Sequence, residues 1–187
     1  MLNYTSPIKE NKKYADLVIK EIGPIIKLNL RGKKIEFLST VGKTLNMILP
    51  TEANTSSSSE KLTAIWLSPD EWMIFSNNTT EKDNNSYEIE EILYNNISKK
   101  NFGSVTDVTD QFVMINFNGT KIFELFAFGC AYDFTQFKEK IGSAAQTILN
   151  HIDVIIHNKN SNNVNLFVRR SFSEHLWSWI NDCASRL

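Results

Sequence analysis

The chain contains 187 residues, of which 42% are hydrophobic and 22% charged, and its formal net charge at pH 7 is -1. A chain of this length hides roughly 70% of its extended surface on folding, so it needs neither disulfides nor metal ions to hold a core. Because 20 Lys and Arg nearly balance 21 Asp and Glu, the overall charge gives no attraction to nucleic acid or anionic lipid, and only a local patch could bind either.

The first part of the chain predicts strands, a helix and a loop. Residues 17–30 are rich in β-branched residues and are interrupted by Gly23 and Pro24, which predicts two extended segments around a turn. Apolar residues at helical spacing predict a short helix over residues 35–46. Residues 51–60 contain a run of four serines and little to bury, which predicts a mobile loop.

A hairpin and a helix are predicted in the middle of the chain. The apolar runs 62–67 and 72–75 flank a Ser-Pro-Asp-Glu sequence in which proline favours a chain reversal. A second polar, mobile loop is predicted over residues 77–86. Residues 87–100 carry isoleucine and leucine at helical spacing, with Glu early and Lys late, as suits the dipole of a helix.

The next segment repeats this scheme. Residues 105–109 and 112–117 predict a second hairpin, and an apolar helix follows over residues 119–128. Residues 70–75 and 110–115 align at a spacing of 40 residues, and each precedes a predicted helix. This pattern indicates a weak internal β-β-α duplication. We expect all 187 residues to form a single domain with two intertwined subdomains.

The C-terminal part predicts two strands and a capped helix. Residues 145–157 and 164–168 are strand-like, and the polar segment 158–163 connects them. Ser171 and Glu174 fit a capping box, in which each side chain accepts a hydrogen bond from a backbone N–H at the start of the helix. One apolar stripe follows on this helix, formed by Phe172, Leu176, Trp179, Ile180, Cys183 and Leu187.

Motif spacing excludes several kinds of site. The seven glycines are never closer than nine residues apart, so neither of the two common glycine-rich nucleotide loops can be present. Cys130 and Cys183 form no CxxC pair and are predicted to be packing residues, which fits a cytoplasmic protein. We expect neither a signal peptide nor a membrane span, because no apolar run is long enough.

Catalytic and metal-binding patterns are sparse. His151 and His157 would share the polar outer face of a strand, but roughly 20 Å of extended chain separates them, which is too far for one metal ion. Asp107 and Asp110 could act as a carboxylate pair in acid-base chemistry, although turn formation is the favoured interpretation. We therefore predict no catalytic, cofactor-binding or metal-binding residue in this chain.

Tryptophan and arginine residues instead indicate a surface for partners. Arg169 and Arg170 end a predicted strand, where they could bind carboxylates of a partner. Trp72 and Trp177 lie off the obvious buried stripes, and Trp and Arg contribute a large share of association energy. The candidate interface residues are Asp70, Trp72, Arg169, Arg170, His175 and Trp177.

Five sequence blocks, in order, resemble a known family. They are residues 66–72, 105–112, 129–133, 145–147 together with 151–157, and 167–177. Together they resemble the gamma subunit of heterotetrameric sarcosine oxidase, from about residue 25 to the end of the chain. That family is similar to the folate-binding domain of the glycine cleavage T-protein. The resemblance implies an α+β fold with duplicated β-β-α-type units and mixed or antiparallel sheets.

The resemblance also implies a non-catalytic, structural role. Heterotetrameric sarcosine oxidase demethylates sarcosine oxidatively to glycine, forms hydrogen peroxide, and passes the one-carbon unit to tetrahydrofolate or releases it as formaldehyde. The implied partners are the alpha, beta and delta subunits, with no nucleic acid and no membrane. FAD and FMN are expected in beta, NAD and tetrahydrofolate in alpha, and zinc in delta, with no cofactor in this chain. The polar insertions near residues 51–60 and 77–86 depart from the family pattern.

Two alternatives stay open. One is a subunit of N-methylglutamate dehydrogenase, whose subunits are similar. The other is a stand-alone folate-binding, one-carbon transfer protein of the T-protein type, with Asp107 or Asp110 as the carboxylate directed at the pterin. An isolated subunit that exposes an apolar patch is also expected to self-associate.

Overall fold

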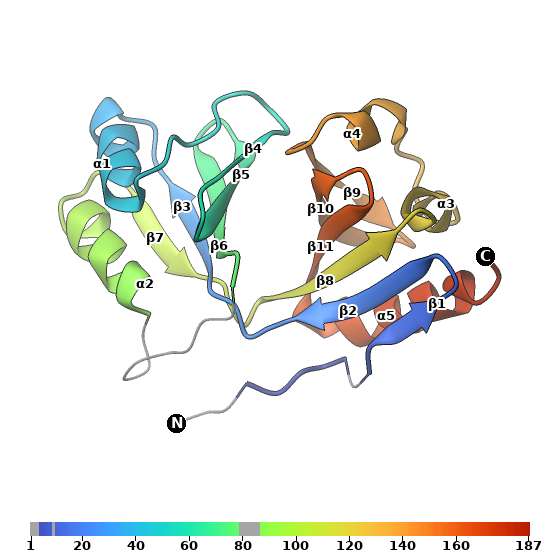
Figure 1. The fold of residues 1–187 in the computed structure, drawn as a ribbon. Coiled ribbons are helices and arrows are strands. Elements are labelled where there is room, and N and C mark those ends of the chain that lie inside the picture. Colours follow the sequence, from blue (N-terminus) through green and yellow to red (C-terminus); the bar gives the residue numbers. More distant parts are fainter. Residues whose placement is uncertain (1–3, 9, 79–86) are drawn as a thin grey trace. The chain divides into compact units, whose positions relative to one another are not determined.

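The chain is organised as two structural units in a computed structural model that describes residues 4–8, 10–78 and 87–187 (Figure 1). Unit 1 comprises Pro24–Asp110, and unit 2 comprises Tyr4–Gly23 together with Gln111–Leu187. The backbone therefore passes from one unit to the other twice, so unit 1 is inserted in the sequence of unit 2.

Unit 1 is built on a five-stranded antiparallel sheet. Its strands, in spatial order, are β4 (Ser56–Ser58), β5 (Leu62–Ser68), β6 (Glu71–Ser76), β3 (Lys27–Arg31) and β7 (Ser104–Asp107). Its helical segments are α1 (Ile35–Leu45), α2 (Glu88–Leu93) and the π-helix η1 (Tyr94–Ser98), which continues α2. Figure 1 shows α1 and α2 side by side on the same face of this sheet.

The core of unit 1 explains why these helices form. Phe37, Val41 and Leu45 recur every four residues along α1 and are all buried. Each large apolar side chain that is removed from water stabilises the fold by roughly 1.5 to 3 kcal/mol. They pack in one cluster with Leu28, Leu30, Trp72 and Ile74 of the sheet and with Leu93 and Ile97 of α2 and η1. The helices predicted over residues 35–46 and 87–100 are therefore confirmed, and the second contains a π-turn.

The first predicted hairpin is confirmed, but the loop before it contains a strand. β5 and β6 pair antiparallel, with Trp66 opposite Trp72. Within the predicted loop 51–60, β4 pairs with β5, and the Ser58 hydroxyl lies 3.0 Å from that of Thr63. Serines carry no hydrophobic period, so the sequence pattern could not indicate this edge strand. Residues 79–86 of the second predicted loop lie outside the described residues.

Unit 2 is built on a six-stranded antiparallel sheet. Its strands, in spatial order, are β1 (Lys12–Tyr14), β2 (Leu17–Ile22), β8 (Phe112–Gly119), β11 (Asn163–Arg169), β10 (Ile152–Asn160) and β9 (Ala144–Leu149). Its helices are α3 (Ile122–Ala127), α4 (Thr135–Glu139) and α5 (Arg170–Ala184). The antiparallel sheets and their helices confirm the predicted α+β fold class.

The second core lies in unit 2. Phe117 of β8 and Phe126 of α3 meet edge to face with ring centroids 5.1 Å apart. Leu176 and Ile180 of α5 are fully buried in the same cluster. The helix predicted over residues 119–128 is confirmed as the shorter α3.

The second predicted hairpin is wrong. β7 pairs with β3 in unit 1, whereas β8 pairs with β2 and β11 in unit 2. The chain leaves unit 1 between β7 and β8, so these neighbouring strands belong to different sheets. A local pattern predicts strands and turns, but strand partners depend on the whole fold.

The long strand predicted over residues 145–157 is in fact a hairpin. β9 and β10 pair antiparallel around Asn150 and His151, both of which have positive φ, as a tight two-residue turn requires. His151 is exposed in this turn, and His157 is buried in β10, so the predicted polar outer face is wrong. β10 also continues to Asn160, which reduces the connection to β11 to a short turn.

The predicted capping box of α5 is also wrong. The helix begins at Arg170, so Ser171 lies inside its first turn, and no side chain caps this end. Instead, the backbone N–H of Arg170 donates to the carbonyl of Gln111 at 2.8 Å. The buried stripe is rotated accordingly, because Phe172 is 49% exposed while Ser173 is buried.

Candidate functional site

The six residues predicted to contact partners are divided between the two units. Asp70 and Trp72 belong to the β5–β6 hairpin of unit 1. The other four, Arg169, Arg170, His175 and Trp177, lie at the end of β11 and along α5 in unit 2.

Asp70 is the acidic centre of a small charged group at the hairpin turn. Its carboxylate accepts a hydrogen bond of 2.8 Å from the Ser68 hydroxyl and lies 3.7 Å from both the Arg31 guanidinium and the Lys33 ammonium. The Ser68 hydroxyl, followed by Lys33 and Arg31, holds the pKa of Asp70 below its usual value. These are exposed ion pairs, so they keep the carboxylate ionised and contribute little to stability.

Trp72 is a core residue of unit 1. Its side chain is only 3% exposed, and its ring lies 5.8 Å from that of Phe37. The indole N–H donates to the carbonyl of Pro50 at 2.8 Å, which ties the segment after α1 to β6. This burial leaves Trp72 almost no surface to offer directly to a partner.

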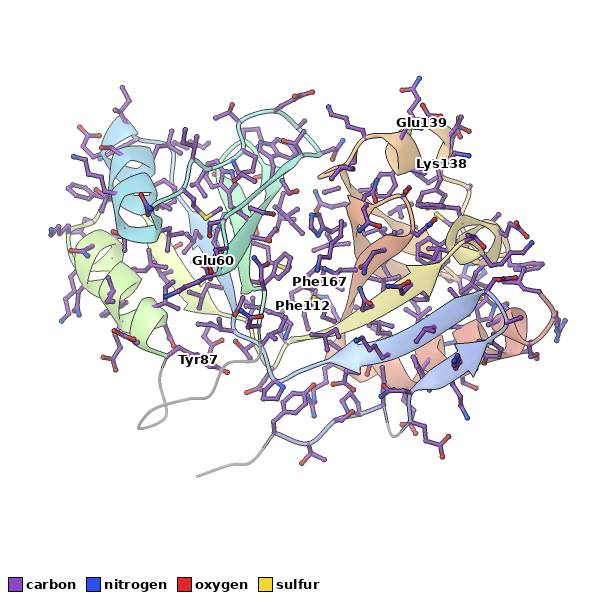
Figure 2. The ribbon with its side chains drawn as sticks, in the orientation of Figure 1. Glu60, Tyr87, Phe112, Lys138, Glu139 and Phe167 are labelled. Carbon is purple, nitrogen blue, oxygen red and sulfur yellow. The ribbon has the colours of Figure 1, made fainter. Side chains whose placement is uncertain are left out.

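Arg169 and Arg170 stack on aromatic rings of unit 2. The Arg169 guanidinium lies 5.8 Å from the ring of Phe112, which is labelled at the start of β8 in Figure 2. The Arg170 guanidinium lies 5.4 Å from the ring of Tyr4 and donates to the carbonyl of Thr5. Stacking of this kind is worth roughly 0.5 to 1 kcal/mol at exposed sites.

Glu21 holds the same N-terminal segment from the other side. Its carboxylate accepts hydrogen bonds from the hydroxyls of Tyr4 and Ser6 and from the backbone N–H of Ile8. Burial, followed by the hydrogen bond to Glu21, raises the pKa of the Tyr4 hydroxyl, so Tyr4 stays a donor at physiological pH. Residues 4–8 are thus fastened by Glu21 of β2 and Arg170 of α5.

We expect Arg170→Ala to loosen residues 4–8 without unfolding unit 2. The substitution removes the stack on Tyr4 and the bond to Thr5, a loss of about 1 kcal/mol that corresponds to roughly five-fold faster amide exchange in this segment. Hydrogen-deuterium exchange read by mass spectrometry measures this rate. Arg169→Ala is the matched control, because Arg169 stacks on Phe112 instead. Unchanged exchange in Arg170→Ala would contradict the assignment.

His175 and Trp177 differ in exposure. His175 is exposed on α5. Trp177 is partly buried, packs against the core of unit 2, and accepts a hydrogen bond from the Asn181 amide at its backbone carbonyl. Only part of its indole is therefore open to a partner.

Residues with catalytic potential have structural surroundings. The Cys130 thiol lies 3.5 Å from the Thr147 hydroxyl, and both Cys130 and Cys183 are buried. Burial raises the pKa of Cys183, which keeps the thiol protonated and weakly nucleophilic. Asp107 accepts a 2.8 Å hydrogen bond from the Thr109 N–H, as in a turn. Among the described residues, no three His, Cys, Asp or Glu side chains gather closely enough to hold a metal ion.

Unit 1 also has an apolar groove that the sequence patterns did not predict. It encloses about 510 Å³ between the outer face of α1 and the segment that follows this helix. Its lining residues are Leu38, Ser39, Gly42, Lys43, Asn46, Met47, Ile48, Leu49 and Thr51. The sequence signal was present as the run from Met47 to Leu49, but periodicity alone cannot reveal that Ile48 points into solvent.

A solved structure shows the same fold in an assembly. A chain of the heterotetrameric sarcosine oxidase from Corynebacterium sp. U-96, in complex with pyrrole 2-carboxylate, matches with a TM-score of 0.80. The two chains are 19% identical, and the match covers 91% of this chain and 84% of that chain. The protein therefore has the α+β fold of a component of a multi-subunit oxidase.

The sequence comparison then gives the family. The family described as sarcosine oxidase, gamma subunit, matches residues 32–186, and the chain belongs to this family. This result confirms the family expected from the five sequence blocks and favours it over both alternatives.

Two further comparisons add nothing to this assignment. A Clostridium acetobutylicum aspartate kinase has a TM-score of 0.42 and 11% identity over 94% of this chain and 36% of that chain, which carries no argument. No curated protein matches significantly.

The helices of the described residues include none that is long and apolar enough to cross a membrane.

Proposed function

We propose that this chain is the non-catalytic, structural gamma subunit of a cytoplasmic heterotetrameric sarcosine oxidase. The complex would demethylate sarcosine oxidatively to glycine, form hydrogen peroxide, and pass the one-carbon unit to tetrahydrofolate or release it as formaldehyde. The observation that carries this proposal is membership of the gamma subunit family over residues 32–186.

The surroundings of its reactive side chains support a role without chemistry of its own. Nucleophilic catalysis needs a thiol or hydroxyl beside a base, with the nucleophile activated. The Cys183 thiol has a raised pKa, and Asp107 is engaged in a turn. The carboxylate of Asp70 serves exposed ion pairs.

The partners in this proposal are the alpha, beta and delta subunits. FAD and FMN are assigned to beta, NAD and tetrahydrofolate to alpha, and zinc to delta. The contribution of this chain is then the surface on which these subunits assemble, with no cofactor in this chain.

We expect co-expression with alpha, beta and delta chains to give a stable four-chain particle that oxidises sarcosine. Size-exclusion chromatography with mass spectrometry measures the composition, and hydrogen peroxide release measures turnover. Omission of this chain should abolish the four-chain particle and lower the yield of active enzyme. An equally stable and active three-chain enzyme would contradict the proposal.

A control separates this proposal from an independent folate-binding protein. The purified single chain should show no heat and no thermal shift on titration with tetrahydrofolate, because a bound ligand stabilises the native state. Saturable binding would favour the T-protein-like alternative with Asp107 or Asp110 at the pterin.

A further inference from the structure

We infer that the apolar groove beside α1 in unit 1 docks another subunit of the complex, and that its occupant is an apolar segment carrying carboxylate side chains. This inference rests on the proposed function and adds a surface and a partner chemistry to it. Four features of unit 1 support it: exposed apolar side chains, a glycine in the groove, a hydrogen-bonded backbone at one side of the groove, and a lysine as the one ionisable residue among the described residues that line it.

The groove presents large apolar side chains to solvent. Ile48 is 86% exposed, although its neighbours Met47 and Leu49 are buried. Ile35 does not line the groove, but it is 82% exposed and lies one turn before the lining residue Leu38 on the same face of α1, because residues three apart are neighbours on a helix. Large apolar side chains exposed in and beside a groove are a common feature of interaction sites in proteins.

Gly42 leaves space in the middle of this apolar stripe. It lies seven residues after Ile35, two turns along the same helix face. Glycine has a low helix propensity, so helix stability alone would favour a residue with a side chain at this position. A Cβ atom here would meet only the Met47 carbonyl oxygen, at 3.3 Å, so the missing side chain leaves the space over Gly42 open.

The backbone segment that carries Ile48 is held by hydrogen bonds on both sides. The Ile48 carbonyl accepts a 2.6 Å hydrogen bond from the Ser57 hydroxyl of β4. Two residues later, the carbonyl of Pro50 accepts from the Trp72 indole. The Met47 N–H donates to Gly42 at the end of α1, closing the turn. A backbone fixed in this way presents Ile48 without the ordering cost that weakens binding by mobile loops.

The charge of the groove selects the occupant. Of the described residues that line it, Lys43 alone is ionisable. An occupant with carboxylates at its edge would therefore gain attraction and orientation. A second copy of this chain fits less well, because a two-fold contact through this groove would bring two Lys43 ammonium groups to the same interface.

Competition during assembly tests this inference in the intact complex. Wild-type chain and a differently tagged variant are co-expressed with the other subunits, and the purified complex is analysed for the share of each. We expect Ile48→Asp to be incorporated roughly ten-fold less than the wild type, and Lys43→Glu roughly three- to ten-fold less. The melting temperature of isolated Ile48→Asp should stay unchanged, because this side chain is exposed. That of Lys43→Glu should fall by only about 1 to 4 °C, because Lys43 lies in the last turn of α1, where a negative charge opposes the helix dipole.

Ile141→Asp is the matched control, since Ile141 is 69% exposed in unit 2 and does not line the groove. Equal incorporation of Ile48→Asp and wild type would overturn the docking site. Incorporation of Lys43→Glu at or above the wild-type level would overturn the carboxylate-bearing occupant. Loss of self-association in isolated Ile48→Asp, with unchanged incorporation, would identify a second copy as the occupant and also overturn it. A wild-type chain that enters no complex would instead contradict the proposed function, before any variant is compared.

Discussion

Gly119→Ala is expected to lower the free energy of unfolding by about 3 to 4 kcal/mol. Gly119 ends β8 with a φ of 144°, a conformation that residues with a side chain rarely adopt. A Cβ atom there would lie 2.0 Å from the carbonyl oxygen of Asp16. That oxygen accepts a hydrogen bond from Thr120 and sits beside the β2–β8 pairing, so it cannot move away freely.

Urea denaturation followed by circular dichroism measures this loss as a lower midpoint. Gly42→Ala provides a matched control, because its Cβ would approach only the Met47 carbonyl, at 3.3 Å. The gain in helix propensity should keep that variant within about 1 kcal/mol of wild type. A wild-type midpoint for Gly119→Ala would contradict this prediction, because it would mean that the backbone at the end of β8 can make room for a Cβ atom.

Trp72→Ala is expected to destabilise unit 1 by about 3 to 5 kcal/mol. The substitution empties the core beside Phe37 and leaves the Pro50 carbonyl without its indole donor. Because that bond fastens the segment carrying Ile48, exchange of its amides should also accelerate. Hydrogen-deuterium exchange of peptides from unit 1, together with urea denaturation, measures both effects.

Trp72→Phe separates packing from hydrogen bonding. It keeps most of the ring volume but removes the donor to Pro50, and should cost about 1 to 3 kcal/mol. If Trp72→Ala instead kept wild-type stability and only failed to join the complex, Trp72 would be a direct contact residue, as predicted from the sequence. Its assignment to the core of unit 1 would then be wrong.

Elements with strong local patterns were predictable from the sequence. The spacing of Phe37, Val41 and Leu45 repeats the period of a helix, and α1 follows it closely. Pro69 and its polar neighbours favoured the reversal that joins β5 and β6. In these segments, local preference and tertiary packing favour the same structure.

Features that depend on distant parts of the chain were not predictable. β7 pairs with β3 in one sheet, and β8 pairs with β2 and β11 in the other, so their partners lie far away in the sequence. The start of α5 is determined by a backbone bond from Arg170 to Gln111, which no local capping motif reveals.

The candidate surface was predictable only in part, for the same reason. Arg169 and His175 are exposed, as residues of a partner-contacting surface should be, whereas Trp72 is buried. The exposure of Ile48 depends on how α1, β4 and β6 hold its backbone, and a count of apolar residues carries no such information.

The two passages of the backbone between units bear on how the polypeptide matures at the ribosome. All of Pro24–Asp110 emerges before β8, so unit 1 can complete its sheet during translation. β2, with its apolar Leu17 and Ile19, must wait throughout that interval for β8 to be synthesised. Until then β2 can pair only with the short β1, and the edge that later pairs with β8 stays open through much of synthesis, which exposes this stage to aggregation.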